Sequence, residues 1–124
     1  MRDIQPVHLL DIGPKVSNLH KGLLFLVFHQ PGISDDDRKS LQRRLAPEVG
    51  TQTFGKATAE LVGIWQAQLK NWPDYLPRLP KWLELKVQNL PISRYTGRGN
   101  GDVDVVTAEA LNWLLKKLGA LKPE

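Results

Sequence analysis

The sequence predicts an all-α fold: a compact orthogonal helical bundle of three core helices, with two further helices inserted between them. Apolar residues recur at intervals of three and four in several segments, which is the period of a helix with one buried face. The alternation of apolar and polar residues that is typical of strands never persists beyond a few positions. The 124 residues are too few for two comfortable cores, so we expect residues 1–124 to form a single domain.

The first helix is expected directly after Gly13, with Pro14 in its first turn, where the missing N–H of proline costs nothing. Pro31-Gly32 ends this helix. Its apolar residues form one wide stripe, which predicts a central position in the core. They are Val16, Leu19, Leu23, Leu26 and Val27, widened by Leu24, Phe25 and Phe28.

The second helix is expected to begin after Ser34, a good N-cap residue, and to end before Pro47. The acidic residues 35–37 place negative charge in its first turn, which the helix dipole favours. Leu41 and Leu45 give it only a narrow apolar seam, so it should lie on the surface and pack on one side.

Two further helices are expected in the second half of the chain. One runs from near Gly55 toward Lys70, and a short one covers residues 81–90 with Pro80 in its first turn. Their apolar positions are Ala57, Leu61, Ile64, Trp65 and Leu69 in the first, and Trp82, Leu83, Leu85 and Leu90 in the second.

The last helix is expected to begin at Asp104, a strong N-cap, with the Thr107 hydroxyl reaching back toward the cap. Gly119 has the residue type that commonly follows a helix end. Leucines 111, 114, 115 and 118 form the buried stripe of this helix.

The net charge of +4 comes from basic residues that are scattered along the chain and interleaved with acidic ones. This distribution is typical of solvated helix faces, and it also permits weak attraction to an anionic polymer such as cell-wall glycan or nucleic acid. The sequence has no signature that combines aromatic and basic residues as RNA-binding sheets do, so we expect no nucleic-acid partner.

The chain contains no cysteine, which excludes disulfides and thiolate chemistry. Residues 1–6 show no signal-peptide pattern, so export would depend on a larger parent protein or a dedicated secretion machine. The longest apolar stretch, residues 23–28, is far too short to span a bilayer, so we expect no membrane insertion. The compartment stays open.

An internal repeat links the third and the last expected helices. Residues 54–65 and 103–114 share the tripeptide Thr-Ala-Glu, beginning at Thr58 and Thr107, with apolar residues at matching positions. Phe54 and Val103 stand before the two helices, where an apolar side chain can tuck under the first turn as in a hydrophobic staple. Two such units would bury one shared core.

Three segments of the chain carry motifs in a fixed order. They are residues 13–23 with Gly, Val, Leu-His and Leu at 13, 16, 19–20 and 23; residues 54–66 with Phe-Gly, Thr, Val and Trp-Gln at 54–55, 58, 62 and 65–66; and residues 101–111 with Gly, Val-Asp, Thr and Leu at 101, 103–104, 107 and 111. Together these segments resemble the peptidoglycan-binding-like domain. The chain differs from typical members in two insertions, about 29–50 and 71–99, in Gln52-Thr53 before the Phe-Gly turn, and in His20, where Gln is commonest.

The resemblance implies a non-catalytic module that binds peptidoglycan or a related cell-wall glycan. Aromatic side chains in the inserted segments can stack on sugar rings or anchor a protein, and Arg94 and Arg98 in the glycine-rich loop can line an anion site. The alternatives are that the aromatics pin the insertion to the domain and that the loop is a flexible turn. The candidate ligand-binding residues are Trp72, Tyr75, Arg94, Tyr95, Arg98 and Asp102.

We expect no enzyme activity, metal or cofactor. His20 and His29 are nine residues apart on one expected helix, on opposite sides of it, so they do not form a zinc site. The acidic run 35–37 is better explained by helix capping than by calcium. Asp102 and Asp104 could be imagined as a glycosidase pair, but Asp104 is accounted for as a cap.

Two functions follow from these patterns. The first is a glycan-binding module that targets a parent protein to peptidoglycan. The second is a protein-interaction or structural module, of a secreted toxin or secretion assembly, that keeps the fold without binding glycan. The insertions favour the second function because they would reshape any groove between the helices.

Overall fold

The computed structural model describes residues 1–29, 33–71, 78–89 and 101–121. These residues contain five helices and no strand, and none of the helices is long and apolar enough to cross a membrane. The predicted all-helical bundle is therefore confirmed. The helices are α1 (Pro14–His29), α2 (Asp35–Thr51), α3 (Lys56–Lys70), α4 (Lys81–Val87) and α5 (Val105–Lys117).

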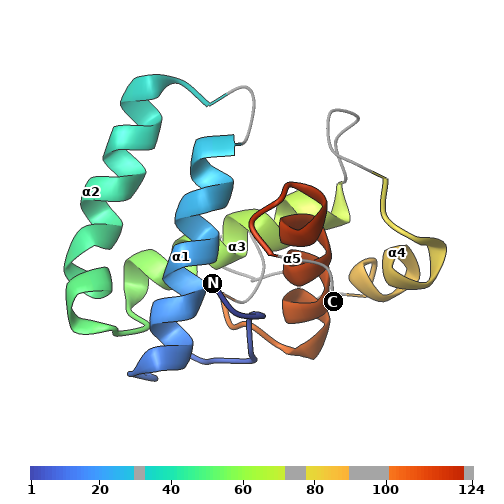
Figure 1. Ribbon diagram of the computed structural model, residues 1–124, viewed down its shortest axis with the longest axis horizontal. Coiled ribbons are helices and arrows are strands. Elements are labelled where there is room, and N and C mark those ends of the chain that lie inside the picture. Colours follow the sequence, from blue (N-terminus) through green and yellow to red (C-terminus); the bar gives the residue numbers. More distant parts are fainter. Residues whose placement is uncertain (30–32, 72–77, 90–100, 122–124) are drawn as a thin grey trace.

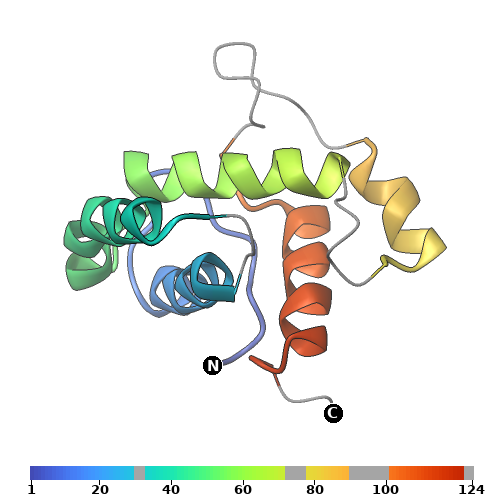
Figure 2. The same cartoon turned by 90° about the horizontal axis from the view of Figure 1, so that it is seen from above.

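Helices α1, α3 and α5 form the centre of the bundle, with α2 at one edge and α4 at the other (Figure 1). In Figure 2, α3 and α5 run across one another while α1 and α2 are seen end on, so the three central helices point in different directions. Helices α2 and α4 fall within the two stretches that the sequence identifies as insertions.

The core is built from the predicted stripes of the three central helices. Phe28 is an exception: it lies about a third of a turn away from the stripe of α1 and is 47% exposed. Ile64 is only half-buried. The confirmed core positions are Val16, Leu19, Leu23, Leu26, Val27, Leu61, Trp65, Leu111, Leu114 and Leu115.

Helix α2 begins as predicted, because the Ser34 side chain accepts a hydrogen bond from the Asp37 N–H. The predicted end before Pro47 is wrong, since the helix continues through this proline to Thr51. Proline removes one backbone donor. Tertiary contacts hold the last turn in place, because Glu48, directly after the proline, is hydrogen-bonded to the start of α3.

Helix α4 does not bury all of its predicted apolar positions. Leu83 and Val87 are buried against α3 and α5, in a second small cluster. Trp82 and Leu85 are 56% and 66% exposed, because they lie on the opposite side of the helix. Partly buried Trp113 of α5 packs against both apolar clusters.

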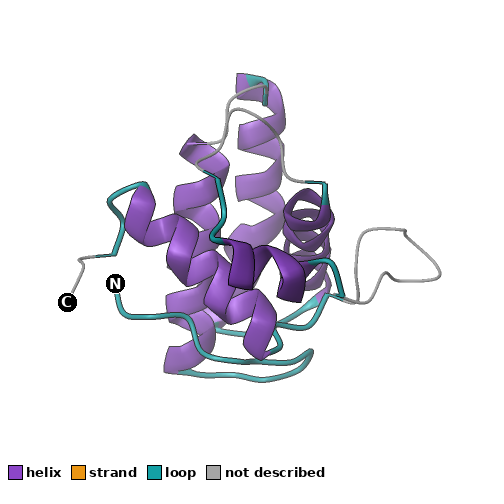
Figure 3. Cartoon of the chain, turned by 90° about the vertical axis from the view of Figure 1, so that its right-hand side faces the viewer, coloured by secondary structure: helices purple, strands orange, loops and turns teal. Residues whose placement is uncertain are grey.

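The N-terminal segment runs along one end of the bundle (Figure 3) and contacts both repeat units, at the segments before α3 and α5. Its backbone pairs with the segment before α5 at Val7 and Val103, and with the segment before α3 at Ile12 and Thr53. Short extended pieces are therefore present before both helices. Buried Ile4 anchors the segment in the core.

Candidate functional site

The start of α3 is capped from another helix. Its own N-cap residue is Gly55, which has no side chain, and the carboxylate of Glu48 from α2 takes over that role. This carboxylate accepts hydrogen bonds from the backbone N–H groups of Gly55, Ala57 and Thr58, each at 2.9 Å, and from the Thr58 hydroxyl at 2.7 Å. A Cβ at position 55 would lie 2.7 Å from the Glu48 side chain, so only glycine leaves room for this cap.

The start of α5 is capped in the matching way by its own N-cap residue. The Asp104 carboxylate accepts from the Thr107 N–H at 2.7 Å, which confirms the predicted cap. The Thr107 hydroxyl does not reach back to the cap as expected. It accepts a hydrogen bond at 3.1 Å from Gln66 of α3, because the turn brings that amide within reach.

Gln66 joins α3 to the turn before α5. Its Nε2 also donates to the Asp102 carbonyl at 2.8 Å, and its Oε1 accepts from the Gly101 N–H at 3.1 Å. Gly101 has a φ of +80°, and a Cβ there would lie 3.0 Å from the backbone oxygen of Ala59. The turn at Gly101 therefore requires glycine.

His20 contacts the hydroxyl of Thr58 in the same way as Gln66 contacts the hydroxyl of Thr107. Its Nε2 lies 2.8 Å from the Thr58 hydroxyl, and both threonines are the third residue of their helix. The equivalence extends along α1 and α3, where the buried pairs are Val16 with Val62, Leu19 with Trp65, and Leu23 with Leu69. The repeat found in the sequence therefore involves three helices. The two residues of each pair, and likewise His20 and Gln66, are separated by the same number of residues. This constant separation is the sequence signal that could have revealed the third unit.

The protonation state of His20 follows from its contacts. The Thr58 hydroxyl donates its proton to Glu48, so it accepts from His20, which must carry its proton on Nε2. His20 is 1% exposed and its Nδ1 has no hydrogen-bond partner. Burial lowers the pKa of His20, although the nearby Glu48 carboxylate raises it. The imidazole is thus a neutral structural contact that no substrate can reach.

We expect this cluster to make the protein sensitive to acid in two steps. Because the folded pKa of His20 lies below 6.5, the unfolded chain binds more protons, and stability falls as the pH drops below 6.5. Burial raises the pKa of Glu48, but the hydrogen bonds from Thr58, Ala57 and Gly55 outweigh it and lower that pKa below 4.5. Stability should therefore fall again below pH 4.5. Urea unfolding measured between pH 2.5 and 8 checks both steps.

The variant His20→Gln separates the two steps. Glutamine can donate to Thr58 as Gln66 donates to Thr107, so the loss that begins below pH 6.5 should disappear while the loss below 4.5 remains. His8→Gln, at an exposed position, should leave both steps unchanged. A wild-type protein whose stability is constant from pH 7 to 5 would contradict the assignment of His20 as a buried neutral group.

Of the predicted ligand-binding residues, only Asp102 lies within the described part of the chain. Its carboxylate accepts from the Leu9 N–H at 3.0 Å, so it helps to fix the N-terminal segment. The other predicted ligand-binding residues lie outside the described residues: Trp72, Tyr75, Arg94, Tyr95 and Arg98. They stay predictions.

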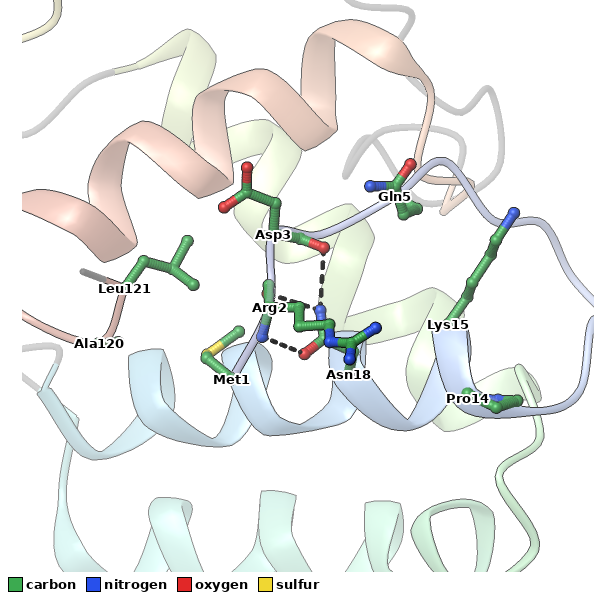
Figure 4. Close-up of a pocket in the computed structure, with 9 residues that line it drawn as sticks. All are labelled: Met1, Arg2, Asp3, Gln5, Pro14, Lys15, Asn18, Ala120 and Leu121. Carbon is green, nitrogen blue, oxygen red and sulfur yellow. Dashed lines mark hydrogen bonds between the residues drawn. The ribbon is translucent and has the colours of Figure 1, made fainter. Parts of the chain in front are cut away.

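A pocket of about 870 Å³ lies between the N-terminal segment, the first turns of α1 and the residues after α5. Asn18 of α1 forms one wall, and its amide exchanges hydrogen bonds with the Arg2 backbone at 2.9 and 2.7 Å. Figure 4 shows Met1 and Leu121 at one end of the pocket and Lys15 at the other, with these hydrogen bonds between them.

The pocket combines apolar and charged groups. Its apolar end is formed by Met1, Ala120 and Leu121, and its polar end contains Gln5 and Lys15; Arg2 and Asp3 also line it, with one charge of each sign. Lys15 is exposed and forms no ion pair within the described part of the chain. Such a site suits a small ligand that has both an apolar group and an anionic group. No sequence pattern marks this site, because its walls come from segments far apart in the chain.

The fold and these contacts define a class: an all-helical bundle in which two turn-and-helix units share one core and carry a surface pocket. No family model, curated protein or solved structure matches the chain. Among the residues that the structure describes, no group of three or more His, Asp or Glu side chains could hold a metal ion.

Proposed function

We propose that this protein is a non-catalytic binding module for peptidoglycan or a related cell-wall glycan. The observation that carries the proposal is that residues of the resembling motifs have matching structural roles. Phe54 and Val103 are both fully buried before their helices, and Thr58 and Thr107 both receive a polar side chain from the preceding unit. The motifs therefore build one repeated architecture, and this repeat supports the proposal.

The pocket supports the choice of ligand. Peptidoglycan carries N-acetyl methyl groups on its sugars and carboxylates on its stem peptides, so one disaccharide peptide offers an apolar and an anionic group together. An N-acetyl group matches the end formed by Met1 and Leu121, and a carboxylate matches the Lys15 ammonium. The net charge of +4 also favours approach to an anionic polymer.

Co-sedimentation with purified peptidoglycan sacculi tests this function. Wild-type protein should be retained saturably, and Lys15→Ala should weaken the apparent affinity about threefold to fivefold, as expected for one exposed charge contact. Lys21→Ala removes the same charge from an exposed position on the same helix outside the pocket, and should bind like the wild type.

The same experiment tests two of the predicted loop residues, Trp72 and Arg98. If Trp72 and Arg98 contact the glycan, the double variant Trp72→Ala, Arg98→Ala should lose retention while remaining folded. Retention that is equal in the wild type and the double variant would remove these residues from the site. Folded wild-type protein that is not retained at all would contradict the glycan-binding function.

A second candidate function is a protein-interaction module, and one surface favours it. Leu9, Leu10 and Ile12 are 51%, 78% and 75% exposed on the N-terminal segment. Leu10 has a φ of +77°, a conformation that leucine rarely adopts, in a turn closed by the hydrogen bond from the Asp11 N–H to the His8 carbonyl. An apolar, fixed turn of this kind can anchor a protein partner. Absence of sacculus binding, together with a crosslinked partner lost in Leu10→Ala, would favour this function.

A further inference from the structure

Four neighbouring side chains cover the solvent face of α4. Across the helix surface they follow the order Lys81, Leu85, Trp82 and Lys86, because residues three and four apart are neighbours on a helix. All four are exposed, while Leu83 and Val87 on the opposite side fix the helix to the bundle. We call this exposed face, formed by residues 81, 82, 85 and 86, the α4 platform.

The indole of Trp82 is held in place although it is exposed. The Lys86 ammonium lies over its ring, 5.4 Å from the ring centroid. Lys86 in turn contacts the carboxylate of Glu109 on α5 at 3.2 Å. One face of the indole is therefore occupied by a cation that the bundle holds, and 56% of Trp82 is left open to solvent. A ring fixed in this way loses little conformational entropy when a ligand stacks on it.

The surroundings of Trp82 are positively charged. Arg78, just before α4, and Lys81 are exposed, and neither forms an ion pair within the described part of the chain. Lys81 lies on the α4 platform beside Leu85, and Arg78 precedes the helix by three residues, whereas the charge of Lys86 is paired with Glu109. The partner that complements this surface is anionic and carries a flat apolar face.

The size of the apolar surface indicates which partner fits. Among the described residues, Trp82 and Leu85 are the large apolar side chains of the α4 platform, and a tryptophan contributes at most about 250 Å². A stable protein interface needs about 800 Å² on each partner. These two side chains alone are therefore too few for a protein partner, whereas one sugar ring can cover an indole.

From these observations we infer that the α4 platform is a second contact surface for glycan: a sugar ring stacks on Trp82 beside Leu85, and a carboxylate of the same strand binds at Lys81 and Arg78. The inference rests on the proposed function and extends it from one pocket to two contact points on a carboxylate-bearing strand. Two weak contacts on one polymer would raise the overall affinity above that of either alone.

The experiment measures co-sedimentation of the full chain with purified sacculi. Trp82→Ala should raise the apparent Kd about fivefold to tenfold, the loss expected for one stacked ring, and Trp82→Phe should recover part of it. Lys81→Ala should weaken binding about threefold and reduce its dependence on salt. Phe28→Ala removes an aromatic that is 47% exposed from α1, a helix that lies away from α4 (Figure 1), and should bind like the wild type. The exposed position of Trp82 predicts an unchanged thermal midpoint for its variants.

Several outcomes separate this inference from the proposed function. If the wild type is retained and Trp82→Ala binds equally well, the α4 platform plays no part and the glycan-binding function stands. If the folded wild type is not retained, the proposed function fails and this inference fails with it. If Lys81→Ala loses as much affinity for neutral chitin as for sacculi, the carboxylate contact is overturned. Self-association that disappears in Trp82→Ala would assign the surface to a second copy of the chain.

Discussion

Replacement of Phe54 by alanine is expected to destabilise the protein by about 3–5 kcal/mol, the usual cost of emptying a core site of this size. Phe54 is fully buried. Its backbone also holds the N-terminal segment, with its N–H donating to Asp11 and its carbonyl accepting from Leu10, both at 2.8 Å. A cavity here would loosen both the start of α3 and that segment. Urea denaturation gives the change in the free energy of unfolding.

The chain offers a matched control for this substitution. Phe28→Ala makes the same chemical change at a side chain that is 47% exposed, and it should cost less than about 1 kcal/mol. Similar losses for the two variants would mean that Phe54 does not hold the first repeat unit against the core, and the proposed architecture would need revision.

Removal of the Glu48 carboxylate is expected to have the second largest effect. Glu48→Ala should destabilise the protein by about 2–3 kcal/mol, because three backbone N–H groups and one hydroxyl lose a charged acceptor. Glu48→Gln keeps one acceptor oxygen and turns an NH₂ group toward donors, so it should cost about 1–2 kcal/mol. Both values come from urea unfolding at pH 7.

The pH profile distinguishes the cap from a general loss of packing. Glu48→Ala should also abolish the fall in stability below pH 4.5, because that step belongs to this carboxyl. Asp36→Ala, an exposed acidic residue in the first turn of α2, should cost less than about 1 kcal/mol and keep the step. A Glu48 variant as stable as the Asp36 variant would show that α3 does not depend on a cap from α2.

Much of the fold was predictable because the stripes of α1, α3 and α5 follow the helical period closely. Caps with local partners were predictable too: Ser34, Asp104 and Gly119, which has a φ of +89°, lie at helix ends as expected. Predictions that depended on tertiary context were wrong. Periodicity could not reveal that α2 passes through Pro47, nor that Trp82 faces solvent while Val87 is buried.

The candidate site was less predictable, since its parts come from distant segments. Glu48 is seven residues before Gly55, and nothing local marks it as the cap of α3. His20 and Thr58 are 38 residues apart, and Gln66 and Thr107 are 41 apart. Only a comparison of α1 with α3 would have linked these pairs. Asp102 was predicted as a ligand residue and stays a prediction in that role; the sequence did not show that its carboxylate accepts from the Leu9 N–H.

Saturable binding to purified sacculi tests the central claim most directly. We expect retention of the folded wild-type chain at physiological salt and competition by soluble disaccharide peptides released from the same sacculi. Lys15→Ala and Trp82→Ala should be retained more weakly than Lys21→Ala and Phe28→Ala. Folded wild-type protein that stays in the supernatant at every sacculus concentration would contradict it.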